Sequence, residues 1–259
     1  MAAVPRIFVE SPLSAGSELP LPANASRHVQ VLRLQPGDAL WLFDGLGGQW
    51  RAEVALMGRK EVVARALQHQ ALDCELPQPV TLALGMPANE RMDTLVEKAT
   101  ELGAARIQPL VTDRSVLRVD GERAERKARH WQAIAVAACE QSGRNRVPEI
   151  AAPVTLAQYL AGAPLAAGQQ GLQLSLADGV QRLAQRLAAT AATADAGGWL
   201  LLSGPEGGLT AAEQAQAAAQ GFAPVSLGAR VLRADTAPLA ALAVIAALTE
   251  GEGEGEARA

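Results

Sequence analysis

The chain has 259 residues, of which 49% are hydrophobic and 3% aromatic, and it carries a formal net charge of −4. This length suits one large domain or two ordinary ones, and the apolar content excludes a globally disordered chain. No run of about 18 uncharged apolar residues occurs, which argues against a membrane span. The first residues lack the charged and then apolar order of a secretory signal, so we expect a cytoplasmic protein.

The cysteines and histidines exclude the common metal and disulfide frameworks. Cys74 and Cys139 have no CxxC partner, and the three histidines (His28, His69 and His130) lie far apart in sequence. Such isolated thiols are typical of reduced cysteines, and scattered histidines do not supply the ligand spacing of a zinc centre. We therefore expect no metal.

Most of the net negative charge lies in residues 250–259, which hold four Glu and one Arg and so contribute −3 of the total −4. The rest of the chain is nearly neutral and contains a basic cluster over residues 121–130, followed by Arg144 and Arg146. A local basic face can bind phosphate groups, or it can be a solvated helix surface. For Arg123 to Arg129 we favour the solvated surface.

Residues 1–72 are predicted to form a small β-rich domain. Their short strands are separated by turn residues, and this pattern is typical of a small barrel. Ser26 is predicted to cap a helical turn. The expected elements are strands at 6–10, in two parts over 39–56 around a glycine-rich hairpin at 44–48, and at 60–69, with the helical turn at 26–34.

A linker at residues 72–79, with two prolines and little periodicity, divides this domain from the next. From residue 73 to 249 strands alternate with helices, which predicts an α/β domain built on a parallel sheet. Residues 250–259 are predicted to be a disordered tail. The expected strands are 80–86, 106–112, 171–177, 198–203 and 222–228, and the expected helices are 89–103, 123–143, 179–196, 211–220 and 236–251.

The segment LLSGPEGGLT (201–210) joins an apolar strand to a helix through three glycines. Thr210 and Glu213 have capping-box spacing, so the helix is expected to begin near Ala211. In open parallel sheets ligands bind at this edge, and glycines let the backbone approach a ligand. The turn matches neither a P-loop, nor GxGxxG, nor GxSxG. A purely steric need for glycine in a tight turn remains the alternative.

A second loop, SLGARVLRADTA (226–237), also follows a strand and precedes a helix, with Asp235 or Thr236 as its cap and Pro238 in its first turn. Together with the glycine turn, this loop is similar to the C-terminal signatures of the 16S ribosomal RNA (uracil-N3)-methyltransferases of the SPOUT superfamily. Segments 27–45, 97–115 and 140–150 resemble further motifs of the same family. The resemblance extends over nearly the whole chain.

The resemblance implies a PUA-like RNA-binding β-barrel followed by a SPOUT domain with a C-terminal trefoil knot. It also implies S-adenosyl-L-methionine as cofactor, 16S rRNA of the small ribosomal subunit as substrate, and a homodimer. Two departures from the family pattern are Ser203 in place of Ile and Asp235 in place of Glu. The implied cofactor-binding residues are Leu202, Ser203, Gly204, Pro205, Glu206, Gly207, Gly208, Leu227, Gly228, Val231, Leu232 and Arg233.

Methylation at N3 of uridine requires an unpaired base and loss of the N3 proton. Arg233 is expected to stabilise the uridine anion, and Arg144 with Asn145 to hold the nucleotide. Glu206 is expected to orient the uracil or accept the proton. The alternatives are that Glu206 only favours a helix N-terminus and that Arg144 forms an ion pair at a surface or in a dimer.

In the N-terminal domain Arg6, Arg27, His28 and Arg33 are expected to contact the RNA backbone, with His28 in a structural rather than a catalytic role. Three other functions stay open. They are ribose 2′-O methylation by the same fold, a non-enzymatic RNA-binding assembly factor, and a regulator that binds another adenosine compound.

Overall fold

The structure is a computed structural model that describes residues 4–59, 61–190 and 197–249. The predicted tail at 250–259 and the last part of the helix predicted over 179–196 lie outside these residues. The chain divides into two compact units. The first comprises Met1–Cys74 and Val136–Val147, and the second comprises Glu75–Ala135 and Pro148–Ala259. The expected boundary between residues 72 and 73 stays a prediction, and the structure adds residues 136–147 to the first unit.

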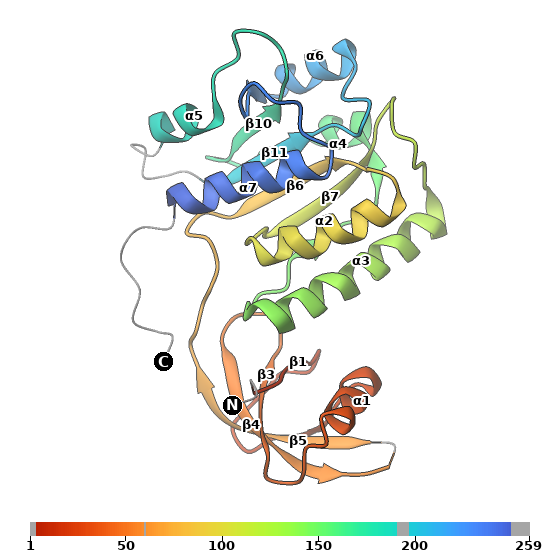
Figure 1. Cartoon of the computed structure of the whole chain (residues 1–259), viewed down its shortest axis with the longest axis vertical. Helices are drawn as coiled ribbons and strands as arrows, with labels where there is room; N and C mark the ends of the chain where they lie inside the picture. Colours follow the sequence, from red (N-terminus) through yellow and green to blue (C-terminus); the bar gives the residue numbers. More distant parts are fainter. Residues whose placement is uncertain (1–3, 60, 191–196, 250–259) are drawn as a thin grey trace. The chain divides into compact units, whose positions relative to one another are not determined.

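The first unit is built on a curled five-stranded sheet with the order β1-β3-β4-β5-β2 (Figure 1). Its core contains Ile7, Leu40, Leu42 and Val62, all at most 1% exposed, together with Val29 from the helix α1. The alternation of buried and outward-facing side chains expected for such strands is present in β4 and β5. The elements are β1 (Arg6–Phe8), β2 (Glu18–Pro20), α1 (Ala23–Val31), β3 (Ala39–Phe43), β4 (Gln49–Met57) and β5 (Val62–Gln70).

The predicted cap of α1 is wrong. The helix begins at Ala23, directly after Pro22, and no side chain caps it. Ser26 therefore lies inside the helix, where its hydroxyl donates to the carbonyl oxygen of Leu21 at 3.1 Å. The fixed φ of proline suits a helix start without a capping side chain, so the helix starts one turn before the serine.

The long helix α3 (Gly121–Ser142) contributes residues to both units. It ends where the sequence predicts, because Gly143 has a φ of +87° that other residues rarely adopt. In the first unit, the carboxylate of Glu140 accepts a hydrogen bond of 3.0 Å from the backbone N–H of Phe8. The end of α3 is thus held to strand β1.

The second unit contains a seven-stranded sheet with the order β12-β10-β11-β6-β7-β8, and β9 also pairs with β7. Every strand pair in it is parallel, which confirms the predicted α/β class. The central strand β11 is buried along its whole length. The strands are β6 (Val80–Gly85), β7 (Arg106–Val111), β8 (Glu149–Ile150), β9 (Val154–Thr155), β10 (Gln170–Leu174), β11 (Trp199–Ser203) and β12 (Ala223–Val225).

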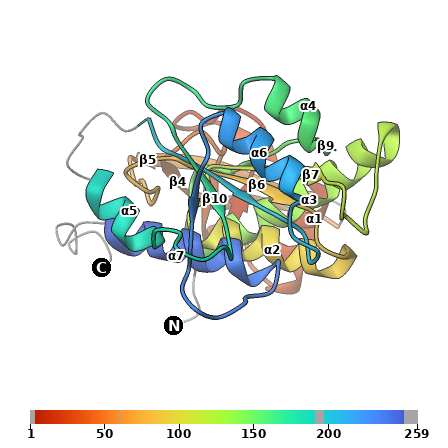
Figure 2. The same cartoon turned by 90° about the horizontal axis from the view of Figure 1, so that it is seen from above.

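Helices cover both faces of this sheet. Figure 2 shows α4 and α6 on one face and α2, α5 and α7 on the other. Helix α7 packs against α2, α5, β6 and β11. The short elements β2, β8, β9 and α4 were not predicted from the sequence. The helices are α2 (Asn89–Glu101), α4 (Leu156–Ala161), α5 (Leu183–Thr190), α6 (Ala211–Ala219) and α7 (Thr236–Thr249).

The last strands bring three connections to one edge of the sheet. Strand β10 lies between β11 and β12, so the carboxyl ends of all three meet there. The chain leaving β12 then runs beside the start of α5, because Ser226 exchanges backbone hydrogen bonds of 2.9 Å with Gln181 and Leu183. The trefoil knot that the resemblance implies stays a prediction.

Candidate active site

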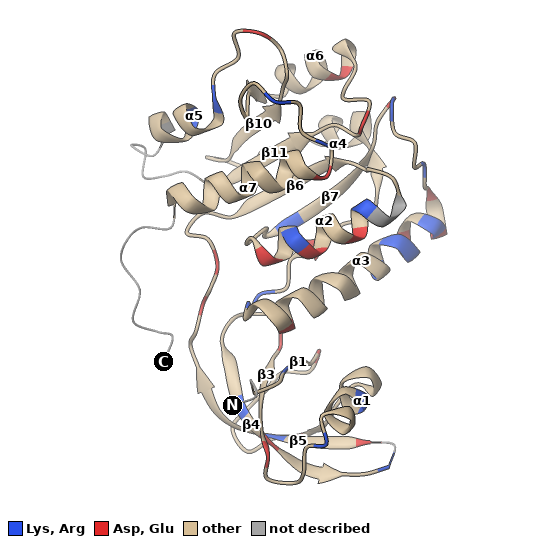
Figure 3. Cartoon of the chain, viewed as in Figure 1, with Lys and Arg blue, Asp and Glu red and all other residues tan. Residues whose placement is uncertain are grey.

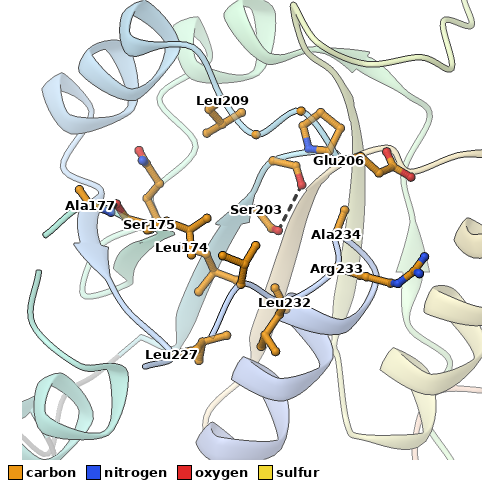
Figure 4. A pocket seen from close by; sticks show the side chains of 18 of the residues that line it. Leu174, Ser175, Ala177, Ser203, Glu206, Leu209, Leu227, Leu232, Arg233 and Ala234 are labelled. Carbon is orange, nitrogen blue, oxygen red and sulfur yellow. Dashed lines mark hydrogen bonds between the residues drawn. The ribbon is translucent and has the colours of Figure 1, made fainter. Parts of the chain in front are cut away.

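A pocket of about 630 Å³ opens at the carboxyl ends of β10, β11 and β12 in the second unit. Three chain segments form its walls, namely residues 173–177, 203–209 and 225–237. Figure 4 shows the side chains of Leu174, Leu227 and Leu232 gathered in it from two of these segments. Most of the lining is therefore apolar side chain and loop backbone, as in small-molecule sites.

The glycine turn forms the first wall and leads into α6. Thr210 is the N-cap of that helix, and its side chain accepts from the backbone N–H of Glu213, which confirms the predicted capping box. Glu213 is buried, and one of its carboxylate oxygens accepts a hydrogen bond of 2.9 Å from the backbone N–H of Asp113. The loop after β7 thus stabilises the start of α6 through this hydrogen bond.

The glycines are also required by the turn itself. Gly208 has a φ of +67°, in the left-handed region. A Cβ on Gly204 would lie 2.9 Å from the backbone carbon of Gly208, and a Cβ on Gly85 would lie 2.6 Å from the backbone nitrogen of Pro205. The steric alternative therefore accounts for the presence of glycine here. The position of the turn in the pocket wall additionally gives its backbone access to a ligand.

The second predicted loop forms another wall. Leu227 and Leu232 are half-buried in the pocket, whereas Val231 and Arg233 are exposed at its rim. The carbonyl of Arg233 accepts from the N–H groups of Thr236 and Ala237 at 3.0 and 2.9 Å, so α7 begins where the sequence predicts. The two loops singled out from the sequence thus line one pocket.

The sequence did not reveal the third wall, Gln173–Ala177 at the end of β10, nor two arginines from other elements. Arg91 of α2 approaches a carboxylate oxygen of Glu206 at 3.3 Å, and the backbone N–H of Ala88 donates to the same oxygen at 3.2 Å. Arg114, from the loop after β7, donates to the carbonyl of Gly207 at 2.8 Å. Both arginines line the pocket and hold the glycine turn.

All but one of the predicted cofactor-binding residues line the pocket; the exception is Leu202, which is fully buried in the core. Of the predicted catalytic residues, Arg233 and Glu206 both line it, and Figure 4 shows them on the side away from Ser175 and Ala177. These two charged side chains thus lie on the same side of the pocket.

Arg144 and Asn145 belong to the first unit and are not among the described residues that line this pocket. They are 3% and 1% exposed. The guanidinium of Arg6 donates to the carbonyl of Arg144 at 3.1 Å, to the side-chain oxygen of Asn145 at 2.7 Å, and to the amide oxygen of Gln49. Arg6 also lies over the ring of Phe43, and burial lowers its pKa. The side chain of Arg6 is therefore occupied by hydrogen bonds to other residues of the first unit.

The other candidate RNA-contacting residues are exposed. Arg27 and His28 lie on α1, and Arg33 follows it with a φ of +58°. In the second unit the basic cluster of α3 is mixed with acidic residues (Figure 3), and Arg129 pairs with Glu125 at 3.8 Å. That mixture fits the solvated surface favoured from the sequence.

Among residues 4–59, 61–190 and 197–249, no group of three or more His, Cys, Asp and Glu side chains is placed to hold a metal ion. Within the same ranges, no helix has the length and apolar character needed to cross a membrane.

Comparison with known proteins identifies the family of this chain. A family model described as an RNA methyltransferase domain matches residues 74–246, and one described as an RNA methyltransferase PUA domain matches residues 21–67. The chain is 41% identical to the ribosomal RNA small subunit methyltransferase E of Synechocystis sp., over 85% of this chain and 70% of the relative. The Mycobacterium bovis protein of the same name is 34% identical over 85% and 82%.

Two solved structures resemble the whole chain. The ribosomal RNA small subunit methyltransferase E of Neisseria gonorrhoeae, bound to S-adenosyl methionine, has a TM-score of 0.85 and 34% identity, covering 95% of this chain and 98% of that one. A methyltransferase of Legionella pneumophila, also with bound cofactor, has a TM-score of 0.83 and 33% identity at the same coverage. The chain therefore belongs to the ribosomal RNA small subunit methyltransferase E family, and is an S-adenosylmethionine-dependent RNA methyltransferase with an N-terminal PUA domain.

Proposed function

We propose that this chain methylates N3 of a uridine in the 16S rRNA of the small ribosomal subunit, using the pocket at the ends of β10, β11 and β12. The observation that carries the proposal is the convergence of the glycine turn and the 226–237 loop on one pocket. Both loops belong to a chain whose relatives are named as small-subunit rRNA methyltransferases, one of them bound to S-adenosyl methionine.

The residues present fit S-adenosylmethionine. Leu174, Leu209, Leu227 and Leu232 offer apolar contact for a planar base, and the loop backbones offer hydrogen bonds. The charged side, with Arg91 and Glu206, complements a ligand that ends in an ammonium and a carboxylate. When bound, the cofactor supplies a methyl group already activated on a sulfonium.

The chain itself must hold the uridine and manage the N3 proton. One oxygen of Glu206 is engaged by Arg91 and Ala88, and the other makes no hydrogen bond to another described residue. We assign this second oxygen to accepting the N3 hydrogen bond or the proton. Arg233, exposed at the rim, stabilises the uridine anion.

Arg144 and Asn145 were expected to hold the nucleotide, and this contact stays a prediction. Because their side chains are buried within the first unit, we propose that they act by positioning other residues of that unit. Contact with the RNA backbone is proposed for Arg27, His28 and Arg33, whose side chains are exposed.

We also propose a cytoplasmic homodimer. Helix α7 is apolar between its terminal residues Thr236 and Thr249, and Leu239 and Val244 remain half-buried while Leu248 is exposed. An apolar helix with such a face is suited to pack against a second copy. Light scattering coupled to size-exclusion chromatography tests this assignment, and a monomer at micromolar concentration would contradict it.

The deciding experiment transfers radiolabelled methyl from S-adenosylmethionine to small subunits from cells lacking this gene, followed by nucleoside digestion. Label in 3-methyluridine is the expected result. Label in a ribose-methylated nucleoside would overturn the assigned reaction. Cofactor binding without labelling would point to another RNA, and no cofactor binding would favour a non-enzymatic assembly factor.

A further inference from the structure

Gln173 is a buried amide that faces the pocket. It lies at the end of β10, is 5% exposed, and is one of the residues that line the pocket. Its side-chain amide has no hydrogen-bond partner among the described residues, yet its atoms are not among those buried from water without a partner, so the amide is open to the pocket. An amide in that position presents a donor and an acceptor to whatever fills the pocket.

Other buried glutamines of this chain have partners. Gln49, also 5% exposed, donates to Gln70 at 3.1 Å, and Gln108, 4% exposed, donates to the carbonyl of Ala152 at 3.0 Å. Even Gln214, at the pocket wall, donates its amide to the carbonyl of Leu209. Buried polar groups are almost always paired, because an unpaired amide loses its hydration without compensation. Gln173 differs from these glutamines because its amide is open to the pocket and has no partner in the described chain, so a ligand in the pocket can supply its hydrogen bonds.

The residues around Gln173 indicate which kind of ligand group its amide can bind. Its strand neighbours in register are Leu202 and Pro224, and the next residue, Leu174, lines the same pocket. The charged residues Glu206 and Arg233 lie on the side of the pocket away from Ser175 and Ala177, which follow Gln173 (Figure 4). A neutral amide among apolar side chains suits a flat, neutral heterocycle with adjacent donor and acceptor atoms. It does not suit an ammonium or a carboxylate.

We infer that Gln173 reads the adenine edge of the cofactor, its amide oxygen accepting from the 6-amino group and its amide N–H donating to the adjacent ring nitrogen. A glutamine amide is complementary to adenine in this way. The inference rests on the proposed cofactor pocket and goes beyond it, since it names a specificity-determining side chain outside the two loops.

Calorimetric binding of S-adenosyl-L-homocysteine and of its analogue with hydrogen in place of the 6-amino group tests this inference. The wild-type protein is expected to prefer the adenine compound by about tenfold or more. Gln173→Leu is expected to weaken binding of the adenine compound by about tenfold or more and binding of the analogue less, because the analogue loses only the hydrogen bond to its ring nitrogen, and so to bring their affinity ratio close to one. Gln173→Glu keeps the size and the acceptor for the 6-amino group but removes the donor to the ring nitrogen, so it should weaken binding of both compounds and keep the preference for the adenine compound.

The matched control is Gln170→Leu, which makes the same change three residues earlier in β10, outside the pocket lining. It should keep the wild-type ratio, and circular dichroism confirms that each variant is folded. An unchanged affinity ratio in Gln173→Leu, with adenine binding intact, would overturn the role of Gln173 alone. Failure of the wild-type protein to bind either compound would overturn the proposed cofactor pocket and this inference together.

Discussion

The side-chain oxygen of Asn145 accepts a hydrogen bond of 2.7 Å from Arg6, a residue 139 positions earlier in the chain. The amide nitrogen of the same Asn145 donates to the carbonyl of Leu72 at 2.9 Å. One buried side chain thus ties strand β1, the segment after β5 and the turn after α3 together within the first unit.

Asn145→Leu should lower the free energy of unfolding by about 1–3 kcal/mol, because it leaves Arg6 and the Leu72 carbonyl without their partner in a buried place. Urea denaturation measures this change. Arg27→Ala, at an exposed position of α1, is the control and should stay within about 0.5 kcal/mol of the wild type. Unchanged stability combined with lost methyl transfer would instead favour the nucleotide-holding role expected from the sequence.

Arg233→Ala should lower kcat by about 10²- to 10³-fold, the usual effect of removing one group that stabilises developing negative charge. Affinity for S-adenosyl-L-homocysteine should change little, because the side chain is exposed at the pocket rim. Single-turnover methylation and calorimetry separate the two effects. Arg233→Lys keeps the positive charge and should recover part of the rate. Full activity in Arg233→Ala would remove Arg233 from the mechanism.

Burial raises the pKa of Glu140, although the Phe8 N–H and the charges of His28 and Arg6 oppose this effect. Since the folded pKa exceeds the unfolded one, Glu140 contributes its full stability below its ordinary value near 4.5 and loses it as the pH rises through the raised value. Glu140→Gln keeps an acceptor for Phe8 without titrating. The stability of the wild type minus that of this variant should therefore fall as the pH rises through that window. A pH-independent difference in urea midpoints would contradict the raised pKa.

Gly208→Ala should destabilise the protein by about 1–2 kcal/mol, because a Cβ is disfavoured at the φ of +67° found there. It should also weaken binding of S-adenosyl-L-homocysteine, since the glycine turn is a pocket wall. The control is Gly162→Ala, at a helix end with a φ of −76°. Equal thermal midpoints for the two variants would argue against backbone strain as the reason for Gly208.

Arg27→Ala and Arg33→Ala should each reduce the salt dependence of binding to 16S rRNA fragments, lowering the slope of log K against log salt by about 0.7–0.9. The physical reason is that each phosphate contact releases condensed counterions. Filter binding over a range of KCl concentrations measures the slope. A slope that neither substitution changes would exclude α1 and Arg33 from the RNA interface.

The long elements and the two ligand loops of the second unit could be predicted from the sequence because their signals are local. Apolar runs mark β6, β7 and β11, and the capping box of Thr210 and Glu213 marks the start of α6. The short elements β2, β8 and β9 have two or three residues each, which is too few for a periodic pattern.

The missed parts of the site depend on contacts between distant residues. Arg91 and Glu206 are 115 positions apart in the sequence, and Arg114 and Gly207 are 93 apart. Neither contact could therefore be predicted from residue spacing along the chain. Gln173 stands in an ordinary strand sequence, and only its place in the pocket lining, with no hydrogen-bond partner for its amide among the described residues, singles it out. Ser26 shows the converse case, in which a local capping signal was present but Pro22 started the helix earlier.

The assignment of Val136–Val147 to the first unit has a consequence for synthesis on the ribosome. Strands β1 to β5 are complete by Gln70, but the residues that satisfy Phe8, Arg6 and Leu72 are translated only by Asn145. At about 5–20 residues per second, those strands wait roughly 4–15 s for their partners. The nascent N-terminal segment thus lacks these hydrogen-bond partners during that interval, and it obtains them only when more than half of the chain has been made.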